Sequence, residues 1–336
     1  MRRVPKAPAA AALLALLAGG GLGGISRAEA PGAPPRLGFP LACTLNKTCW
    51  IQHYVDRDPS GPARDYTCGS LTYGGHNGTD IRIPDMAAER AGVNVLAAAA
   101  GRVLRSRDGM ADISVRTIGL EAVKDAKCGN GLVIDHGGGW STQYCHMAKG
   151  SLIVHPGDVV RAGQPLGHVG LSGETEFPHL HISVRRDGKI VDPFAPDDGA
   201  PGKTCGGGAS LWAQTPPYTP RAVLNAGFAG NGLDMATVEA GEVARPDAHS
   251  PYLAAYVRTL GLRDGDEATL TLLAPDGRVL AATPPTRTVG NKDQSIMLIG
   301  RKRPPLGWGG GVYRAHYSVT HDGRPVLTQD FDITPP

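Results

Sequence analysis

The stretch that decides the fold is His179-Leu180-His181-Ile182-Ser183-Val184, in which polar and apolar residues alternate strictly. Alternation with a period of two is the pattern of a β-strand with one buried face. The aliphatic residues that face the expected core are Leu180, Ile182 and Val184. The residues on the opposite face are His179, His181 and Ser183. We therefore expect two imidazoles side by side on an open sheet surface.

Two further segments add groups that bind metals or move protons. Thr142–His146 alternates in the same way, which predicts that Thr142, Tyr144 and His146 share one face of a strand. The glycine-rich segment Gly74–Asp80 places a histidine and an aspartate four residues apart, and these are His76 and Asp80. Catalytic zinc takes three nitrogen or oxygen ligands and keeps a fourth position for water. Chemistry alone assigns His76, Asp80 and one histidine of the 179/181 pair as ligands, with the other imidazoles as proton shuttles.

The cysteines indicate an oxidising compartment. They are Cys43, Cys49, Cys68, Cys128, Cys145 and Cys205, and no two have the C-x-x-C spacing of a thiolate zinc site or a redox motif. We expect three disulfides, and six cysteines allow 15 connectivities. Cys128 and Cys145 are the best single pair, because they flank a predicted hairpin with its turn near Gly137–Gly139.

The N-terminus has the pattern of a secretory signal peptide over residues 1–30. Basic residues precede the apolar run Ala9–Leu17, which is too short to span a bilayer. Cleavage after Ala28 and cleavage after Ala30 both fit. We expect a protein of the periplasm or the extracellular space, monomeric and without a membrane span once the signal is removed.

Charge and composition exclude several classes of function. The formal charge of +3 comes from 34 basic and 31 acidic residues, and removing residues 1–30 leaves 30 of each. A near-neutral protein gives no electrostatic reason to expect nucleic-acid binding. The 47 glycines, 28 prolines and 5% aromatic residues favour an all-β, turn-rich protein over a helix bundle.

The length of 336 residues predicts two domains, or one domain with a long extension. The second domain is expected to be an immunoglobulin-like β-sandwich, because Ala268–Leu273 and Val279–Ala282 flank a Pro-Asp-Gly turn and Val312–Thr320 alternates. The expected segments are a signal peptide (1–30), a flexible or extended Pro/Gly-rich leader (31–42), a first domain (43–205), a linker (206–219) and the β-sandwich (220–336).

Three motifs, in this order, resemble the lysostaphin/LytM-type zinc peptidases of family M23. They are His76-x-Gly78-x-Asp80, Tyr144-x-His146 and Pro178-His179-Leu180-His181, within a resemblance that covers about residues 70–194. The resemblance implies an antiparallel-sheet peptidase domain with one Zn²⁺ per chain. Its implied ligands are His76, Asp80 and His181, and its implied catalytic pair is His146 and His179. Tyr144 is a candidate oxyanion donor, with a packing role as the alternative.

Two departures from the family pattern concern the substrate groove. Ser106–Lys127 is a long insertion that could shape the groove, and Phe177-Pro178 replaces the usual Gly-Pro and adds an aromatic ring near the metal. The remaining histidines are expected to be structural or on the surface, and they are His53, His136, His155, His168, His249, His316 and His321.

The resemblance implies an exported zinc endopeptidase that hydrolyses peptide cross-links of bacterial peptidoglycan. Both D-amino-acid cross-links and Gly-rich bridges stay open as the bond cleaved. The alternatives are a secreted peptidase acting on Gly-rich proteins, and a non-catalytic wall-binding scaffold that activates a cell-wall amidase. The second domain could bind the wall or dock a partner.

Overall fold

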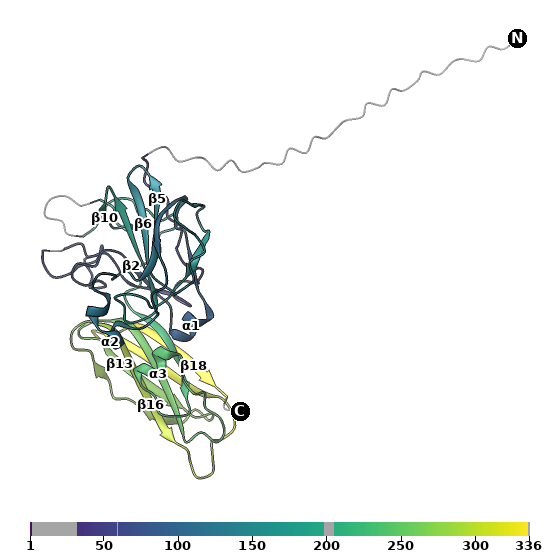
Figure 1. Ribbon diagram of the computed structural model, residues 1–336. Helices are drawn as coiled ribbons and strands as arrows, with labels where there is room; N and C mark the ends of the chain where they lie inside the picture. Colours follow the sequence, from purple (N-terminus) through teal and green to yellow (C-terminus); the bar gives the residue numbers. More distant parts are fainter. Residues whose placement is uncertain (2–31, 59, 198–204, 335–336) are drawn as a thin grey trace. The chain divides into compact units, whose positions relative to one another are not determined.

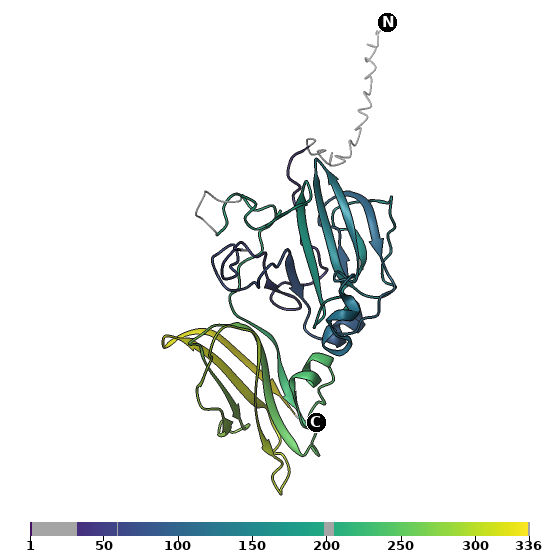
Figure 2. The ribbon, with the colours of Figure 1, turned by 60° about the vertical axis from the view of Figure 1, so that its left-hand side comes forward.

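The computed structural model describes Met1 and residues 32–58, 60–197 and 205–334. The signal peptide expected at residues 1–30 therefore lies outside the described residues, apart from Met1. Pro31–Pro336 forms one compact unit whose two groups of strands are drawn in blue to teal and in green to yellow in Figures 1 and 2. The predicted all-β, antiparallel architecture is confirmed. Within the described residues, every helix is too short or too polar to cross a bilayer.

The first lobe (β1–β10) is built on an eight-stranded antiparallel sheet. Its strand order is β1-β2-β9-β6-β5-β4-β7, with β10 paired to β9, and β3 and β8 form a separate two-stranded sheet. The strands are β1 Trp50–His53, β2 Thr79–Arg82, β3 Asn94–Leu96, β4 Gly101–Arg107, β5 Asn130–Gly137, β6 Trp140–Met147, β7 Val159–Val160, β8 Pro165–His168, β9 His179–Arg186 and β10 Lys189–Val191. The short helices are α1 Met86–Ala91, α2 Val115–Ile118 and the 3-10 helix η1 Leu120–Val123.

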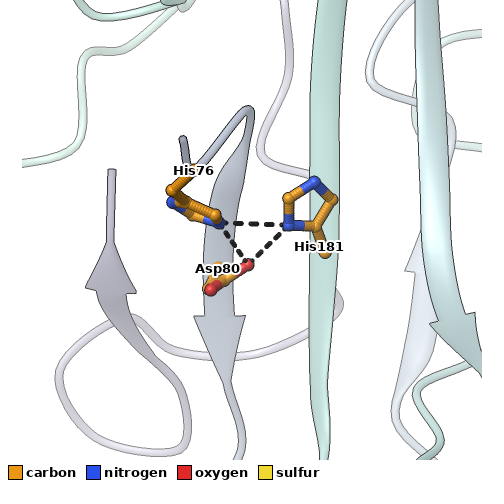
Figure 3. A group of neighbouring side chains, drawn as sticks. All are labelled: His76, Asp80 and His181. Carbon is orange, nitrogen blue, oxygen red and sulfur yellow. Dashed lines mark hydrogen bonds and ion pairs between the residues drawn. The ribbon is translucent and has the colours of Figure 1, made fainter. Parts of the chain in front are cut away.

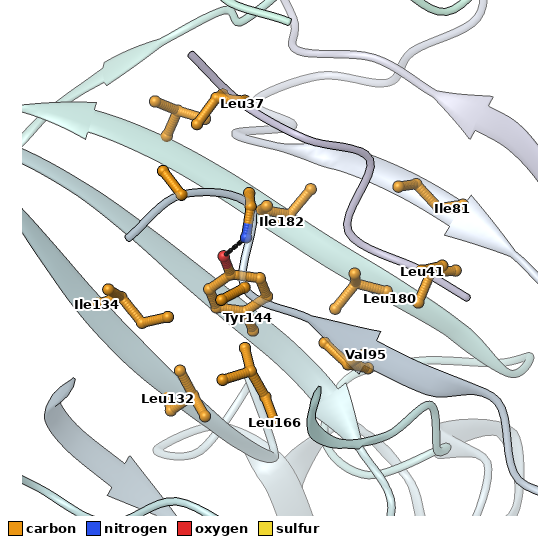
Figure 4. Close-up of a cluster of buried hydrophobic side chains, with 14 of the residues drawn as sticks. Leu37, Leu41, Ile81, Val95, Leu132, Ile134, Tyr144, Leu166, Leu180 and Ile182 are labelled. Carbon is orange, nitrogen blue, oxygen red and sulfur yellow. Dashed lines mark hydrogen bonds between the residues drawn. The ribbon is translucent and has the colours of Figure 1, made fainter. Parts of the chain in front are cut away.

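The core of the first lobe lies on one face of the large sheet, as the alternation in β9 predicted. Leu180, Ile182 and Val184 are all buried in it. Figure 4 shows Leu180 and Ile182 beside side chains from β2, β5 and β6. Because successive strand residues point to opposite faces, this burial directs the histidines of β9 to the other side of the sheet.

Three disulfides stabilise the first lobe, as predicted. Cys128 and Cys145 are joined across the β5–β6 hairpin, which confirms the expected pair. The others join Cys43 to Cys49 and Cys68 to Cys205. The hairpin turn is made by Gly137–Gly139, all three with positive φ, a backbone conformation that glycine adopts without steric cost.

The leader and the linker both pack on the first lobe. Leu37 and Leu41 of the leader, and Leu211 and Trp212 of the linker, are buried in its core. Leu37 and Trp212 also form a parallel bridge. The leader is therefore extended rather than flexible, because its apolar side chains bury against the sheet despite the surrounding proline and glycine.

The second lobe (β11–β18) consists of two antiparallel sheets around one hydrophobic core. The sheets have the orders β11-β12-β16 and β14-β13-β17-β18, with β15 paired to β13. The elements are β11 Ala222–Ala229, α3 Met235–Ala240, β12 Tyr252–Leu262, β13 Glu267–Leu273, β14 Val279–Ala282, β15 Thr286–Arg287, β16 Lys292–Lys302, β17 Tyr313–His321 and β18 Arg324–Ile333. Val257, Leu270 and Tyr317 come from both sheets and share the core, as expected for a β-sandwich.

The two lobes contact each other along β1 and β2. Trp50 of β1 is buried with Leu224 and Leu260 of the second lobe. Beside them, the guanidinium groups of Arg82 and Arg258 both pair with the carboxylate of Glu239. Both arginine side chains are fully buried, so this contact is a packed interface with its own ion pairs.

Candidate metal centre

Neighbouring strands place the three predicted ligands together. β2 pairs with β9 so that Asp80 lies opposite His181, and residues directly opposite each other share a face of the sheet. His76 approaches the same point from the loop before β2. The three side chains converge with His76 Nε2 3.1 Å from Asp80 Oδ1, His181 Nδ1 2.8 Å from the same oxygen, and the two nitrogens 3.2 Å apart (Figure 3).

Hydrogen bonds on the far side of each ring fix which nitrogen faces the centre. His76 Nδ1 donates to the carbonyl oxygen of Tyr54 at 2.7 Å, and His181 Nε2 donates to the amide oxygen of Asn77 at 3.1 Å. A neutral imidazole has one N–H, so His76 Nε2 and His181 Nδ1 present lone pairs to each other and to the carboxylate of Asp80. Three acceptors this close repel one another unless a cation lies between them.

The spacing of these atoms fits zinc. A tetrahedral zinc ion with bonds of roughly 2.0–2.1 Å holds its ligand atoms about 3.3 Å apart. The sides of the triangle, 2.8–3.2 Å, are close to that value. Two imidazoles and one carboxylate are also ligands that zinc prefers.

The two predicted catalytic histidines lie beside this triangle. The ring centroids of His146 and His179 are 4.7 Å apart, and His179 Nε2 is 3.4 Å from Asp80 Oδ1. His146 Nδ1 donates to the carbonyl oxygen of Ser172 at 2.8 Å, and His179 Nδ1 donates to that of Phe177 at 3.0 Å. A neutral ring with this hydrogen bond carries its lone pair on Nε2.

Burial and neighbouring charges set the protonation states at this centre. Burial alone would raise the pKa of Asp80, but the surrounding imidazoles, His76 and His179 first, hold it well below its usual value. Asp80 is therefore ionised. Burial, with smaller contributions from His179 and His181, holds the pKa of His146 well below its usual value. His146 is therefore neutral and able to accept a proton.

An open groove of about 400 Å³ runs over these side chains. It is lined by His76, His146 and His181, and by the charged residues Lys127, Glu174 and Arg185. Lys127 is the last residue of the predicted insertion, so that insertion does reach the groove. Phe177 packs on the ring of His179 with centroids 4.9 Å apart.

Tyr144 does not lie in the groove, which corrects the prediction that it shares a face with His146. Its side chain is fully buried in the core, and its hydroxyl accepts a hydrogen bond from the amide of Ala98 at 2.7 Å (Figure 4). The cause is a β-bulge, because Leu132 pairs with Tyr144 but Asn130 pairs with Met147. The extra residue reverses the alternation, and His146 has a φ of +62°. The packing alternative for Tyr144 is the one observed.

His53 is the residue near the centre that sequence reasoning missed. It is buried on β1, and its Nδ1 is 3.3 Å from Asp80 Oδ2. Burial alone would lower the pKa of His53, but the carboxylates of Asp293 and Asp80 outweigh burial and raise it to about 9. No motif surrounds His53 in the sequence, so only the pairing of β1 with β2 reveals its position.

A carboxylate and two imidazoles with converging lone pairs, beside the two further imidazoles of His146 and His179, form a donor set of the kind that metal-dependent hydrolases use. Residues 74–193 match the sequence profile of Peptidase family M23. The matched segment includes the motifs that resemble this family in the sequence, from His76 to His181.

Individual relatives resemble parts of the chain. Peptidoglycan DD-endopeptidase ShyB of Vibrio cholerae serotype O1 is 30% identical over 122 residues, which are 36% of this chain and 23% of that protein. Murein hydrolase activator EnvC of Escherichia coli K12 is 40% identical over 62 residues, 18% of this chain and 14% of that protein. A solved zinc-containing peptidase from Vibrio cholerae is 26% identical, covering 42% of this chain and 38% of that one with a TM-score of 0.28. The match spans less than a quarter of the length of ShyB and of EnvC.

Proposed function

We propose that this protein is an exported zinc endopeptidase that hydrolyses peptide cross-links of bacterial peptidoglycan. The observation that carries the proposal is the set of four imidazoles whose outer nitrogens are hydrogen-bonded to acceptors. Their inner nitrogens consequently present lone pairs around one ionised carboxylate. Three disulfides support an oxidising, extracytoplasmic location, either the periplasm or the extracellular space.

In this proposal one Zn²⁺ is held by His76, Asp80 and His181. When bound, zinc supplies a Lewis acid for hydrolysis at neutral pH. Asp80 contributes the negative charge of the ligand set, and the two imidazoles contribute neutral nitrogens. Their outer hydrogen bonds to Tyr54 and Asn77 hold the rings in the ligating orientation.

His146 and His179 are proposed to move the protons. The Nε2 lone pair of His146 accepts a proton from the attacking water. It is available because the lowered pKa keeps the ring unprotonated and the Nδ1 proton is donated to the carbonyl oxygen of Ser172. His179 Nε2, on the neighbouring ring, orients the same water. The accepted proton is then returned to the leaving amine, as in general acid–base catalysis.

A peptide of cell-wall type is the proposed substrate. The relatives ShyB and ShyA are named as peptidoglycan DD-endopeptidases. The groove over the candidate site is open and carries both signs of charge, at Lys127, Glu174 and Arg185. Such a groove suits an extended peptide with charged side groups. Residues 43–205 are proposed as the catalytic domain and residues 220–336 as an accessory domain in a monomeric protein.

A second candidate function is a non-catalytic activator of a cell-wall hydrolase. The local identity to EnvC, itself named a murein hydrolase activator, favours it. The complete set of metal ligands and both neighbouring histidines favour the enzyme instead. The two candidates differ in whether the purified protein releases peptide fragments without a partner.

Cleavage of purified, cross-linked peptidoglycan by the zinc-loaded protein, followed by fragment mass analysis, tests the proposal. We expect cross-linked dimers to disappear with the wild-type protein and to persist with Asp80→Ala. His179→Ala should bind zinc and yet fail to cleave, while His168→Ala, which changes an exposed histidine outside the groove, should behave as wild type. Zinc-loaded wild type that cleaves neither wall nor Gly-rich peptide would exclude the enzyme.

A further inference from the structure

A bulge in β1 brings His53 to the candidate metal centre. Trp50 pairs with Arg82 and Ile51 with Ile81, but the next pair is His53 with Asp80, so Gln52 is the extra residue. Without it, position 52 would stand opposite Asp80. Bulges beside active sites commonly redirect one side chain in this way. Here the redirected side chain is an imidazole in contact with the carboxylate of Asp80.

The two oxygens of Asp80 face different partners. Oδ1 lies 2.8–3.4 Å from the inward nitrogens of His76, His179 and His181. Oδ2 lies 3.3 Å from His53 Nδ1. One oxygen is thus directed at the candidate metal position and the other at a buried imidazole.

The second lobe contributes Asp293, which contacts the other nitrogen of the His53 ring. His53 Nε2 lies 3.4 Å from Oδ1 of Asp293, near the start of β16. The neighbouring Gln294 accepts a hydrogen bond from Arg82 at 3.1 Å, and the same guanidinium donates to Gln52 at 3.2 Å. This end of β16 is therefore held against β1 and β2 by contacts that do not involve Asp293.

We propose that Asp293 and His53 are positioning residues that hold Asp80 in its ligating orientation, so that the second lobe completes the metal centre. The inference rests on the proposed function in one respect, the assignment of Asp80 as a ligand. Groups that hydrogen-bond to metal ligands from behind orient them, and their loss typically weakens metal binding about 10- to 100-fold. His53 is in direct contact with Asp80 and Asp293 acts through it, so Asp293→Ala should give the smaller effect.

Zinc affinity, measured by competition with a chelator of known affinity, tests the inference directly. We expect Asp293→Ala to bind zinc about 10-fold more weakly and His53→Gln up to about 100-fold more weakly. The side chain of Asp293 is 67% exposed, so the zinc-free variant should keep the wild-type unfolding midpoint. Asp332→Ala is the matched control, because it removes the same charge from an exposed position on β18, in the other sheet.

The double variant His53→Gln with Asp293→Ala tests whether Asp293 affects zinc binding through its contact with His53 or only through its negative charge. If Asp293 acts through His53, adding Asp293→Ala to His53→Gln should weaken zinc binding little further. At saturating zinc, the single variants should lower kcat for cross-linked peptide while leaving KM unchanged. Wild-type zinc affinity and kcat in Asp293→Ala would overturn the inference. Wild-type zinc affinity in Asp80→Ala would instead overturn the metal assignment itself.

Discussion

At the scale of single residues, the glycine of the first motif has a steric role that its position explains. Gly78 lies between His76 and Asp80, against the ring of His181. A Cβ atom at this position would lie 2.5 Å from His181 Nε2 and 2.7 Å from the carbonyl oxygen of Ile182. Both distances are shorter than real Cβ contacts allow. The glycine therefore lets His181, a proposed metal ligand on β9, approach the backbone before β2.

Gly78→Ala should displace His181 and lower zinc affinity. Because the carbonyl of Ile182 belongs to the core strand and does not move freely, the imidazole is the group that must shift. We expect a loss of roughly 10-fold or more in zinc affinity, comparable to loss of a group that orients a ligand. Chelator competition measures it, and Gly74→Ala is the control, since a Cβ there meets no atom within 4 Å. Equal zinc binding by the two variants would contradict the steric role.

Asp192 makes stability depend on pH in an unusual direction. Its carboxyl is buried, and burial raises its pKa to about 6 from an ordinary value of 3.8. A pKa raised on folding adds stability below pH 3.8, and this stability is lost as the pH rises through 6. We expect Asp192→Asn to exceed wild type by about 2–3 kcal/mol in free energy of unfolding at pH 8. Urea unfolding at pH 8 and below pH 4 checks this, and a constant difference between the two would be inconsistent with burial of the ionised group.

Much of the candidate site was predictable because its residues lie in short contiguous motifs. His179 and His181 alternate with core aliphatics in one strand, so their position on the opposite face of the sheet follows from sequence. Tyr144 was misassigned because a bulge, which leaves no mark in the alternation, separates it from His146. His53 was missed because its contact with Asp80 depends on pairing between strands and on a second bulge.

At the scale of elements, the β5–β6 hairpin holds His146, the proposed proton-transfer residue, in a strained conformation. His146 has a φ of +62°, which a non-glycine residue adopts at a cost. Its amide donates to the carbonyl oxygen of Cys128 at 2.8 Å. Cys128 is bonded through sulfur to Cys145, the residue directly before His146. The disulfide thus stabilises the bulge that directs His146 into the groove.

Replacing this pair, Cys128→Ser with Cys145→Ser, should lower both stability and cleavage. A disulfide that closes a loop of 17 residues contributes roughly 3 kcal/mol. A released bulge displaces the imidazole of His146, and misplacement by about 1 Å can cost up to 100-fold in rate. We expect kcat for cross-linked peptide to fall about 10- to 100-fold under conditions where the variant is fully folded.

The matched control is Cys43→Ser with Cys49→Ser, which removes a disulfide with a sequence separation of six. Neither cysteine lines the groove, so cleavage should be retained in the folded variant. Thermal unfolding followed by circular dichroism establishes the folded fraction of each variant. If the Cys128/Cys145 variant were less stable but had an unchanged kcat, the disulfide would have no part in placing His146.

At the scale of the whole molecule, buried charge joins the two lobes. Arg82 and Arg258 are fully buried and share the carboxylate of Glu239. Burial, partly offset by Glu239, lowers the pKa of Arg82 to about 10, which still leaves it charged at neutral pH. The length predicted two domains, but the contact that joins them, between Arg82 and Glu239, links residues 157 positions apart and follows no periodic pattern. The packing of the linker against the first lobe could not be predicted either, because Trp212 is one apolar residue in a stretch rich in proline and glycine.

Glu239→Gln should destabilise the protein at this interface. It leaves two buried guanidinium groups without a carboxylate, and breaking a buried ion pair from one side costs about 3–5 kcal/mol. Urea unfolding of the full chain measures the loss. Glu242→Gln, an exposed position two residues after α3, serves as control and should change stability by less than about 0.5 kcal/mol. Equal stabilities for the two variants would contradict a packed contact.

The disulfide between Cys68 and Cys205 has a topological consequence. The segment between these cysteines includes all five residues of the proposed metal and proton-transfer centre, from His76 to His181. A protease that cuts the backbone once anywhere inside this segment produces two fragments that stay linked through the sulfur bridge. When the cut lies before β9, each fragment also keeps strands of the eight-stranded sheet. A nicked protein would therefore migrate as one species until it is reduced, and it would retain every group needed at the centre.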